Sequence, residues 1–92
     1  MPVTPLPDLI LYGRPGCHLC EDARAVTAQI LEASRTAGLK VPDLVERNID
    51  TNAEWQRAYF ETIPVLELGD RRLELATSAA RIRRLLSDAL DA

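Results

Sequence analysis

The sequence predicts one α/β domain whose strands and helices follow the order β-α-β-α-β-β-α. Short apolar runs of strand length, such as Leu9 to Tyr12, alternate with longer stretches whose apolar residues recur at helical spacing. Turn signals at Pro15-Gly16 and Gly69-Asp70 separate these segments. This alternation is typical of a parallel β-α-β unit followed by an antiparallel hairpin.

The composition limits the class of protein. The 92 residues suffice for a single domain, 1–92, and the fractions of hydrophobic (47%) and charged (27%) residues are ordinary for a globular protein. A net charge of −3 argues against a nucleic-acid partner. No apolar run approaches the roughly 18 residues of a membrane-spanning helix, and Met1 to Pro7 has neither the basic start nor the long apolar core expected of a secretory signal. We therefore expect a cytoplasmic protein without a membrane partner.

The first strand, Leu9 to Tyr12, leads through the Pro15-Gly16 turn into a helix expected from about His18 to Thr36. Gly38 is a suitable C-terminal stop for that helix. The apolar residues of one helical face are expected to pack inward. They are Leu19, Ala23, Val26 and Ile30.

A second strand, Leu44 to Ile49, is followed by a second helix that starts within Asp50 to Glu54. Thr51 and Glu54 have the spacing of a capping box, which predicts Thr51 as the N-cap. The aromatic residues Trp55, Tyr59 and Phe60 are interpreted as core packing.

The last three elements form a hairpin and a helix. Strands are expected at Val65 to Leu68 and at Arg72 to Leu75, with Leu73 and Leu75 on one face. Thr77 or Ser78 can cap the last helix. That helix has an apolar stripe through Ile82, Leu85, Leu86 and Ala89.

The segment Tyr12 to Cys20 contains both cysteines and the single histidine. Two cysteines separated by two residues can close a disulfide across the first turn of a helix, and a lone pair of this kind indicates a redox dithiol. Cys17 is expected at the helix N-terminus, where free N–H groups and the helix dipole lower a thiol pKa from about 8.5. Arg14 adds a positive charge nearby, and Cys20 is expected to lie deeper.

Two other interpretations of the cysteine pair remain open. It could be half of a zinc site with His18 as a further ligand, but the chain offers three such N or S ligands where structural zinc uses four. It could also be a purely structural disulfide, although so short a loop constrains the unfolded chain little.

Tyr12 to Cys20 resembles the active-site segment of glutaredoxins and other small thioredoxin-fold oxidoreductases. Thr62-Ile63-Pro64 resembles their Thr-x-Pro segment, and the order of elements matches from about Asp8 to Leu90. The resemblance implies a thioredoxin-like fold, with a four-stranded mixed sheet flanked by helices. It also implies a thiol–disulfide oxidoreductase that needs no bound cofactor or metal.

The resemblance implies roles for single residues. Cys17 would be the nucleophile, Cys20 the resolving thiol, and Pro64 a cis-proline beside the dithiol. The backbone of Ile63 would be a docking edge for a peptide or for glutathione. Apart from the resemblance, His18 has two interpretations: it favours the thiolate if protonated, or it is an exposed histidine with little effect. Partners would be protein or small disulfides, with glutathione or a separate reductase as electron donor, and we expect a monomer.

This sequence also departs from the glutaredoxin pattern. His18-Leu19 stands where glutaredoxins usually have Pro-Tyr, and Leu73 to Ser78 lacks their Gly-Gly and Asp. Thr77, Ser78 and the helix N-terminus remain candidates for binding a carboxylate. A redox-sensing adaptor, and a dimeric iron–sulfur or metal carrier that uses Cys17, are the alternative functions.

Overall fold

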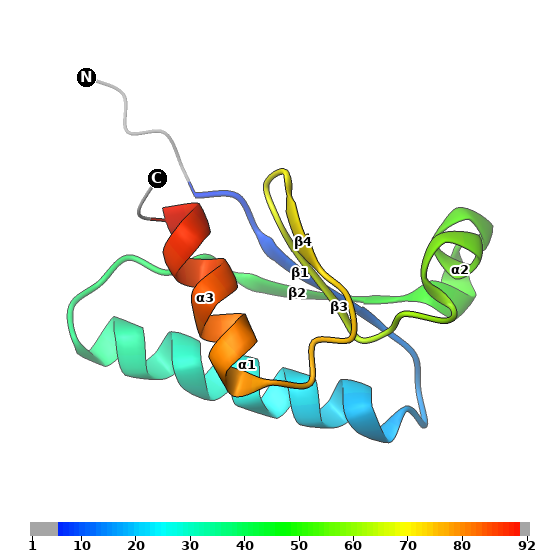
Figure 1. The fold of residues 1–92 in the computed structure, drawn as a ribbon, viewed down its shortest axis with the longest axis horizontal. Coiled ribbons are helices and arrows are strands. Elements are labelled where there is room, and N and C mark those ends of the chain that lie inside the picture. The colour runs from blue at the N-terminus through cyan, green and yellow to red at the C-terminus, as the bar shows by residue number, and fades with distance from the viewer. Residues whose placement is uncertain (1–5, 91–92) are drawn as a thin grey trace.

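The computed structural model describes residues 6–90 and confirms the predicted order of elements (Figure 1). Its elements are β1 (Leu9–Gly13), α1 (His18–Thr36), β2 (Leu44–Asn48), the 3-10 helix η1 (Ile49–Thr51), α2 (Ala53–Tyr59), β3 (Val65–Leu68), β4 (Arg71–Leu73) and α3 (Ala79–Leu90). The four strands form one mixed sheet in the order β2-β1-β3-β4. β1 pairs in parallel with β2 and antiparallel with β3, and β3 pairs antiparallel with β4.

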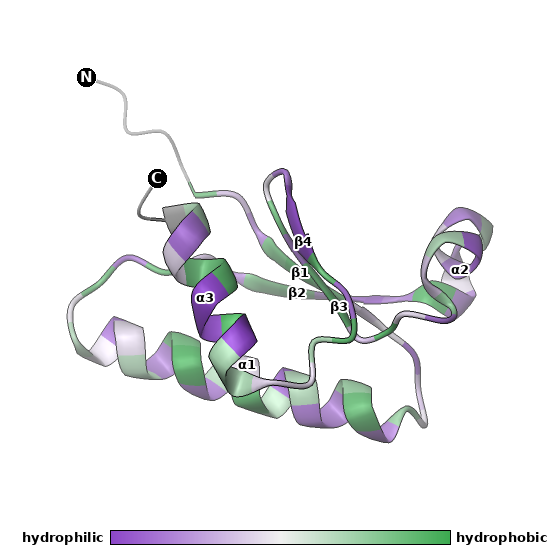
Figure 2. Cartoon of the chain, viewed as in Figure 1, coloured by the Kyte–Doolittle hydropathy of each residue, from purple (hydrophilic) through white to green (hydrophobic). Residues whose placement is uncertain are grey.

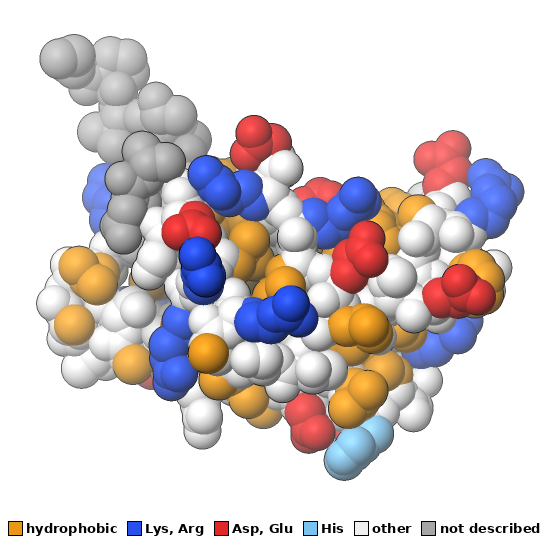
Figure 3. All heavy atoms as spheres, viewed as in Figure 1, with side chains coloured by type: hydrophobic (Ala, Val, Ile, Leu, Met, Phe, Trp, Pro, Cys, Tyr) orange, Lys and Arg blue, Asp and Glu red, His pale blue; other side chains and the backbone are white. Residues whose placement is uncertain are grey.

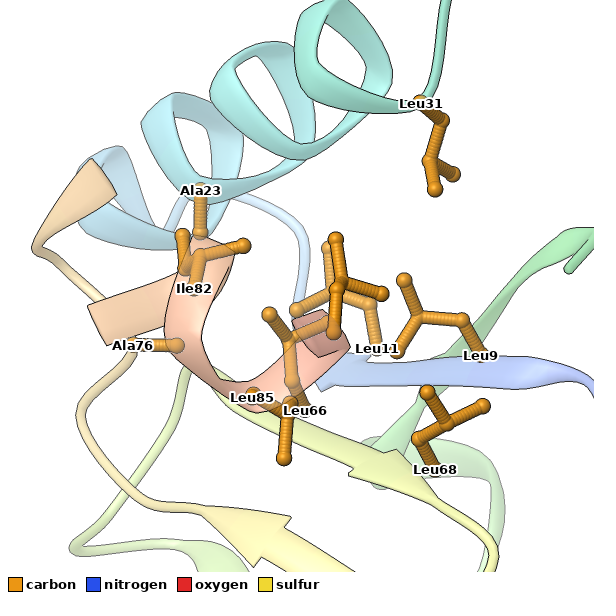
Figure 4. Close-up of a cluster of buried hydrophobic side chains, with 10 residues drawn as sticks. Leu9, Leu11, Ala23, Leu31, Leu66, Leu68, Ala76, Ile82 and Leu85 are labelled. Atoms are coloured by element: carbon orange, nitrogen blue, oxygen red, sulfur yellow. The ribbon is translucent and has the colours of Figure 1, made fainter. Parts of the chain in front are cut away.

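The main core lies between the sheet and the two longer helices. Because successive strand residues point to opposite faces, Leu9 and Leu11 of β1 pack with Leu66 and Leu68 of β3 on the face that α1 and α3 cover. Figure 4 shows these side chains directed toward Ala23 and Leu31 of α1 and Ile82 and Leu85 of α3. Figure 2 shows hydrophobic and hydrophilic residues alternating along both helices, as expected for helices with one buried face.

Helix α1 has the predicted bounds but a slightly different buried face. Its buried residues, spaced for one side of a helix, are Cys20, Ala23, Thr27 and Leu31. Leu19 was predicted to point inward and is instead 48% exposed, because it precedes the buried Cys20 by one residue and so lies about 100° around the helix. Gly38 ends the helix at φ +84°, and its N–H donates to the carbonyl of Arg35.

The opposite face of the sheet carries a smaller cluster around α2. Tyr12, Ile49, Tyr59 and Val65 are buried there. The rings of Tyr12 and Tyr59 are 4.4 Å apart between centroids. Burial raises the pKa of Tyr12, while the hydrogen bond from Arg47 opposes the shift.

Two predictions about α2 were wrong. Its N-cap is Asn52 rather than Thr51, because the Asn52 side chain accepts hydrogen bonds from the N–H groups of Glu54 and Trp55 at 2.9 and 3.1 Å. Thr51 instead ends the 3-10 helix. Phe60 is 54% exposed, because the helix ends at Tyr59 and the chain turns away from the cluster.

The hairpin is shorter than predicted and leads into α3. β4 ends at Leu73, and Leu75 lies outside the sheet, 48% exposed, with a φ of +48°. The prediction that Leu73 and Leu75 share one face was therefore wrong. Ser78 does cap α3, because its hydroxyl accepts a hydrogen bond from the N–H of Arg81 at 3.3 Å. Across residues 6–90, no helix has the length and apolarity that crossing a membrane requires.

Candidate active site

Cys17 and Cys20 are joined by a disulfide where the chain passes from β1 into α1. Their Cα atoms are 5.2 Å apart, within the usual range for a disulfide. Gly16, with a φ of +78°, makes the tight turn that leads into the helix. The strand and turn thus place both sulfur atoms at the N-terminal end of α1.

Cys17 is the N-cap of α1. Its backbone is extended, and its sulfur accepts a hydrogen bond from the N–H of Cys20 at 3.1 Å. Its carbonyl accepts the first helical bond from the N–H of Glu21. Cys17 is partly exposed, whereas Cys20 is only 7% exposed. A helix N–H thus points at the sulfur of the more accessible cysteine, which is the arrangement that stabilises a thiolate there.

Gly13, the last residue of β1, leaves space for Cys20. A Cβ at this position would lie 3.0 Å from the Cβ and 3.1 Å from the sulfur of Cys20. Contacts this short are tighter than nine in ten of those that real Cβ atoms make, so a side chain at position 13 would require Cys20 to shift by a few tenths of an ångström.

Pro64 is preceded by a cis peptide bond, as the resemblance implied. Its neighbour Val65 pairs with Tyr12, and the same antiparallel register places Pro64 opposite Gly13. Pro64 is buried, and its carbonyl accepts a hydrogen bond from the N–H of Ala76 at 2.8 Å. The cis-proline therefore lies one strand away from the glycine that contacts Cys20.

The backbone of Ile63 offers less than the predicted docking edge. Its N–H already donates to the carbonyl of Tyr59 at 3.0 Å. The carbonyls on either side of it, those of Thr62 and Pro64, accept from Leu75 and Ala76. The N–H of Ile63 is thus already engaged within the chain, which leaves less of this backbone segment for the predicted docking edge.

Arg14 does not point a free charge at the cysteines. Its guanidinium pairs with the carboxylate of Asp50, at 2.5 Å from Nη2 to Oδ1 and 3.4 Å from Nε to Oδ2. The hydrogen bond from Arg14 lowers the pKa of Asp50 below its ordinary value. Since opposite charges neutralise one another, Arg14 contributes less to a thiolate at Cys17 than the sequence suggested.

The ion pair of Arg14 with Asp50 gives a testable pH dependence. In Arg14→Gln we expect the pKa of the Asp50 carboxyl to rise toward its ordinary value of about 3.9. Because pairing lowers the pKa in the folded state, it stabilises the fold above pH ~3.9 and is lost as the pH falls through the folded-state pKa. An NMR titration of the Asp50 carboxyl carbon measures the change. Arg35→Gln, which removes the separate pair with Glu32, should leave Asp50 unaffected.

The other predicted site residues lie around the N-terminal end of α1 and the start of α3. His18 is exposed, with Nε2 3.4 Å from Asp22 Oδ2. Ser78 is occupied as the cap of α3, and Thr77 is exposed, with its N–H donating to the carbonyl of Leu75. Thr77, Leu19 and Asp22 border one small groove, so the structure brings these two regions together.

A second, polar groove of about 380 Å³ lies on the Cys20 side of the dithiol. An ion pair between Arg24 and Glu46, 3.5 Å apart, spans two of its walls. Within residues 6–90, no three His, Cys, Asp or Glu side chains converge in a way that could hold a metal ion.

Three residues that shape the site were missed by the sequence analysis. Gly13 and Asp50 could have been found from the parallel pairing of β1 with β2. Gly13 pairs with Asn48 at the ends of these strands, and residues that follow two parallel strands, such as Asp50, meet at one edge of the sheet. Leu75 carried no such signal, because its sequence context favours a strand.

Comparison with known proteins supports the resemblance to glutaredoxins in both sequence and structure. The family model described as "Glutaredoxin-like domain (DUF836)" matches residues 8–89. The crystal structure of XcR50 from X. campestris is 33% identical with a TM-score of 0.70, and the match covers 88% of this chain and 97% of that one. The solution structure of Ne2328 from Nitrosomonas europaea is 27% identical with a TM-score of 0.62, and the match covers 95% and 99%. No curated protein matches.

Proposed function

Because this chain belongs to the family of the glutaredoxin-like domain (DUF836), we propose that it is a thiol–disulfide oxidoreductase with Cys17 as nucleophile and Cys20 as resolving thiol. The observation that carries the proposal is the position of the two sulfur atoms. Cys17 is partly exposed and its sulfur accepts a helix N–H, while Cys20 is buried. Cys17 is suited to attack an external disulfide, and Cys20 is suited to attack the sulfur of Cys17 afterwards.

The exchange proceeds in two steps. The thiolate of the reduced Cys17 attacks one sulfur of the substrate disulfide, which breaks the S–S bond and releases one substrate thiol. The thiolate of Cys20 then attacks the sulfur of Cys17 in the mixed disulfide and releases the second substrate thiol. Two electrons and two protons pass to the substrate, and the protein is left with its Cys17–Cys20 disulfide.

A reductant must restore the dithiol. We propose a small thiol such as glutathione, or a separate reductase, which supplies the two electrons. The protein acts as a monomer without a bound cofactor, on protein or small-molecule disulfides. The cytoplasm is the proposed location, because a lone cysteine pair in that reducing compartment is more often catalytic than structural.

Parallel turnover assays test the proposal. The reduced protein is offered a protein disulfide and a glutathione mixed disulfide, each with a regenerating thiol, and the release of substrate thiols is measured. Multiple turnovers on at least one substrate are expected. A stable complex with one partner and no turnover would contradict the proposal and favour a redox adaptor, whereas visible absorbance in freshly purified protein would favour a metal carrier.

A further inference from the structure

A groove opens between α1 and α3, away from the cysteine end of α1. The two helices lie close together where Ala23 and Ile82 meet in the core (Figure 4). From there α3 rises away from α1, toward the connection that leads to β2 (Figure 1). Because α1 continues to Thr36, its second half is covered only in part, and Val26 and Ile30 are partly buried. The space that remains is a groove of about 790 Å³.

The groove has the size and lining of a small-molecule site. Such sites are usually clefts of ~300–1,000 Å³ with mostly apolar walls and a few polar groups. Here the walls are mainly aliphatic, with Val26 and Ile30 from α1, Leu39 and Val41 from the connection to β2, and Leu86 from α3. Among the described residues that line the groove, none is aromatic. The groove therefore suits an alkyl chain better than a ring that needs a stacking partner.

Part of this aliphatic lining is in contact with solvent. Leu39 is 63% exposed, in the connection that follows Gly38. Val26, Ile30 and Val41 are only partly buried, although they pack against the main core. A ligand that covers these side chains would be stabilised by the removal of their surface from water.

Two basic side chains give the groove a positive charge. Lys40, in the connection to β2, and Arg83, in α3, line it from different elements and are exposed. Within residues 6–90, no carboxylate lines the groove or forms an ion pair with either residue. Figure 3 shows basic (blue) and hydrophobic (orange) side chains adjoining over α3 and the middle of α1. Since the whole chain has a net charge of −3, this positive region is a local feature that complements an anionic group.

We propose that this groove binds a small amphipathic carboxylate. The alkyl chain lies along Val26, Ile30 and Leu39, and the carboxylate is held by Lys40 and Arg83. The site is separate from the dithiol, because it begins at Val26, about 14 Å along the axis of α1 from Cys17. The inference therefore does not depend on the proposed thiol–disulfide exchange.

An NMR titration of the isotope-labelled protein with sodium decanoate, below its micelle-forming concentration, tests the assignment. We expect the amide signals of Ala33, Leu39 and Ser87 in the groove to shift, and those of Gly13 and Cys17 to stay in place. Decanoate should bind at least about tenfold more tightly than butyrate, since each buried methylene contributes roughly fourfold to the affinity. It should also bind about tenfold more tightly than decyltrimethylammonium, which the net charge of the chain would otherwise favour.

A charge-reversal variant tests the two basic residues. Lys40→Glu combined with Arg83→Glu should weaken the binding of decanoate at least about tenfold, because attraction becomes repulsion. The matched control combines Arg71→Glu with Arg81→Glu. It changes the net charge by the same amount at two exposed residues that do not line the groove, and it should bind decanoate as the wild type does.

Several results would overturn the inference. Equal weakening by both double variants would mean that only the overall charge matters. Equal affinity of the wild type for decanoate and for uncharged decanol would remove the role of the carboxylate. Absent binding, or signal shifts spread over the whole surface, would show that the groove is not a site for this ligand. Binding of an acidic amphipathic helical peptide in the groove, without binding of decanoate, would assign the groove to a protein partner instead.

Discussion

The Cys17→Ser variant is expected to lose disulfide exchange with every substrate, with a rate more than about 1,000-fold below that of the wild type. The remaining thiol, Cys20, is only 7% exposed and lies against Gly13, so it is poorly placed to attack an external disulfide. A serine hydroxyl cannot replace the thiolate as nucleophile. Substrate thiol release, measured on the same two disulfides as for the wild type, determines the loss.

The Cys20→Ser variant is the matched control and should behave differently. It keeps Cys17 at the helix N-terminus, so the first step still forms a mixed disulfide, and that covalent complex accumulates because no internal thiol resolves it. Non-reducing gels after incubation with a cell extract should show trapped complexes with Cys20→Ser and none with Cys17→Ser. Equal trapping by both variants would remove the assigned division of roles. Continued activity of Cys20→Ser on glutathione mixed disulfides would reveal a monothiol route.

The Leu66→Ala variant is expected to lower the free energy of unfolding by about 2–5 kcal/mol. Leu66 is fully buried in β3, where it pairs with Leu11 on one side and with Leu73 on the other. Truncation removes apolar contacts with both neighbouring strands and leaves a cavity between the sheet and the helices. A loss of this size is a large part of the ~5–15 kcal/mol that stabilises a typical domain.

Chemical denaturation measures the effect. The slope of the unfolding free energy against denaturant concentration checks that unfolding remains cooperative. Leu39→Ala removes the same number of carbon atoms from a side chain that is 63% exposed, and it should change the free energy by less than about 0.5 kcal/mol. Similar losses for both variants would mean that the Leu66 cluster is not the main core.

The fold was predictable because its main signals are local and periodic. The apolar run at Leu9, the long amphipathic pattern from His18 and the Gly69-Asp70 turn each specify one element without reference to the others. The errors lie where tertiary contacts override local preference. Leu75 has a strand-like sequence context, but its backbone follows hydrogen bonds from residues 75 and 76 to the Thr62–Pro64 segment.

The candidate site was predictable in its residues but less so in its electrostatics. Spacing indicated the Cys17–Cys20 pair and the resemblance to glutaredoxins implied the cis Pro64, and the structure places Cys20 and Pro64 next to Gly13. The pairing of Arg14 with Asp50 depends on two loops that are 36 residues apart in the chain. Sequence reasoning counts charges but does not show which of them neutralise one another, so it overestimated the charge that Arg14 offers to Cys17.

The aromatic cluster beside α2 has a spectroscopic consequence. Trp55 is the single tryptophan of the chain, and its ring packs edge-on against Tyr12 at 5.8 Å and beneath the guanidinium of Arg47 at 5.0 Å. Its fluorescence therefore reports on this face of the sheet alone, whereas far-UV circular dichroism is dominated by the longer helices, α1 and α3, on the other face. Coincident melting curves would show that both faces unfold together, and an earlier change in fluorescence would show that α2 detaches as a separate cooperative unit. One indole thus makes the two sides of the sheet distinguishable by ordinary optical measurements, without any attached label.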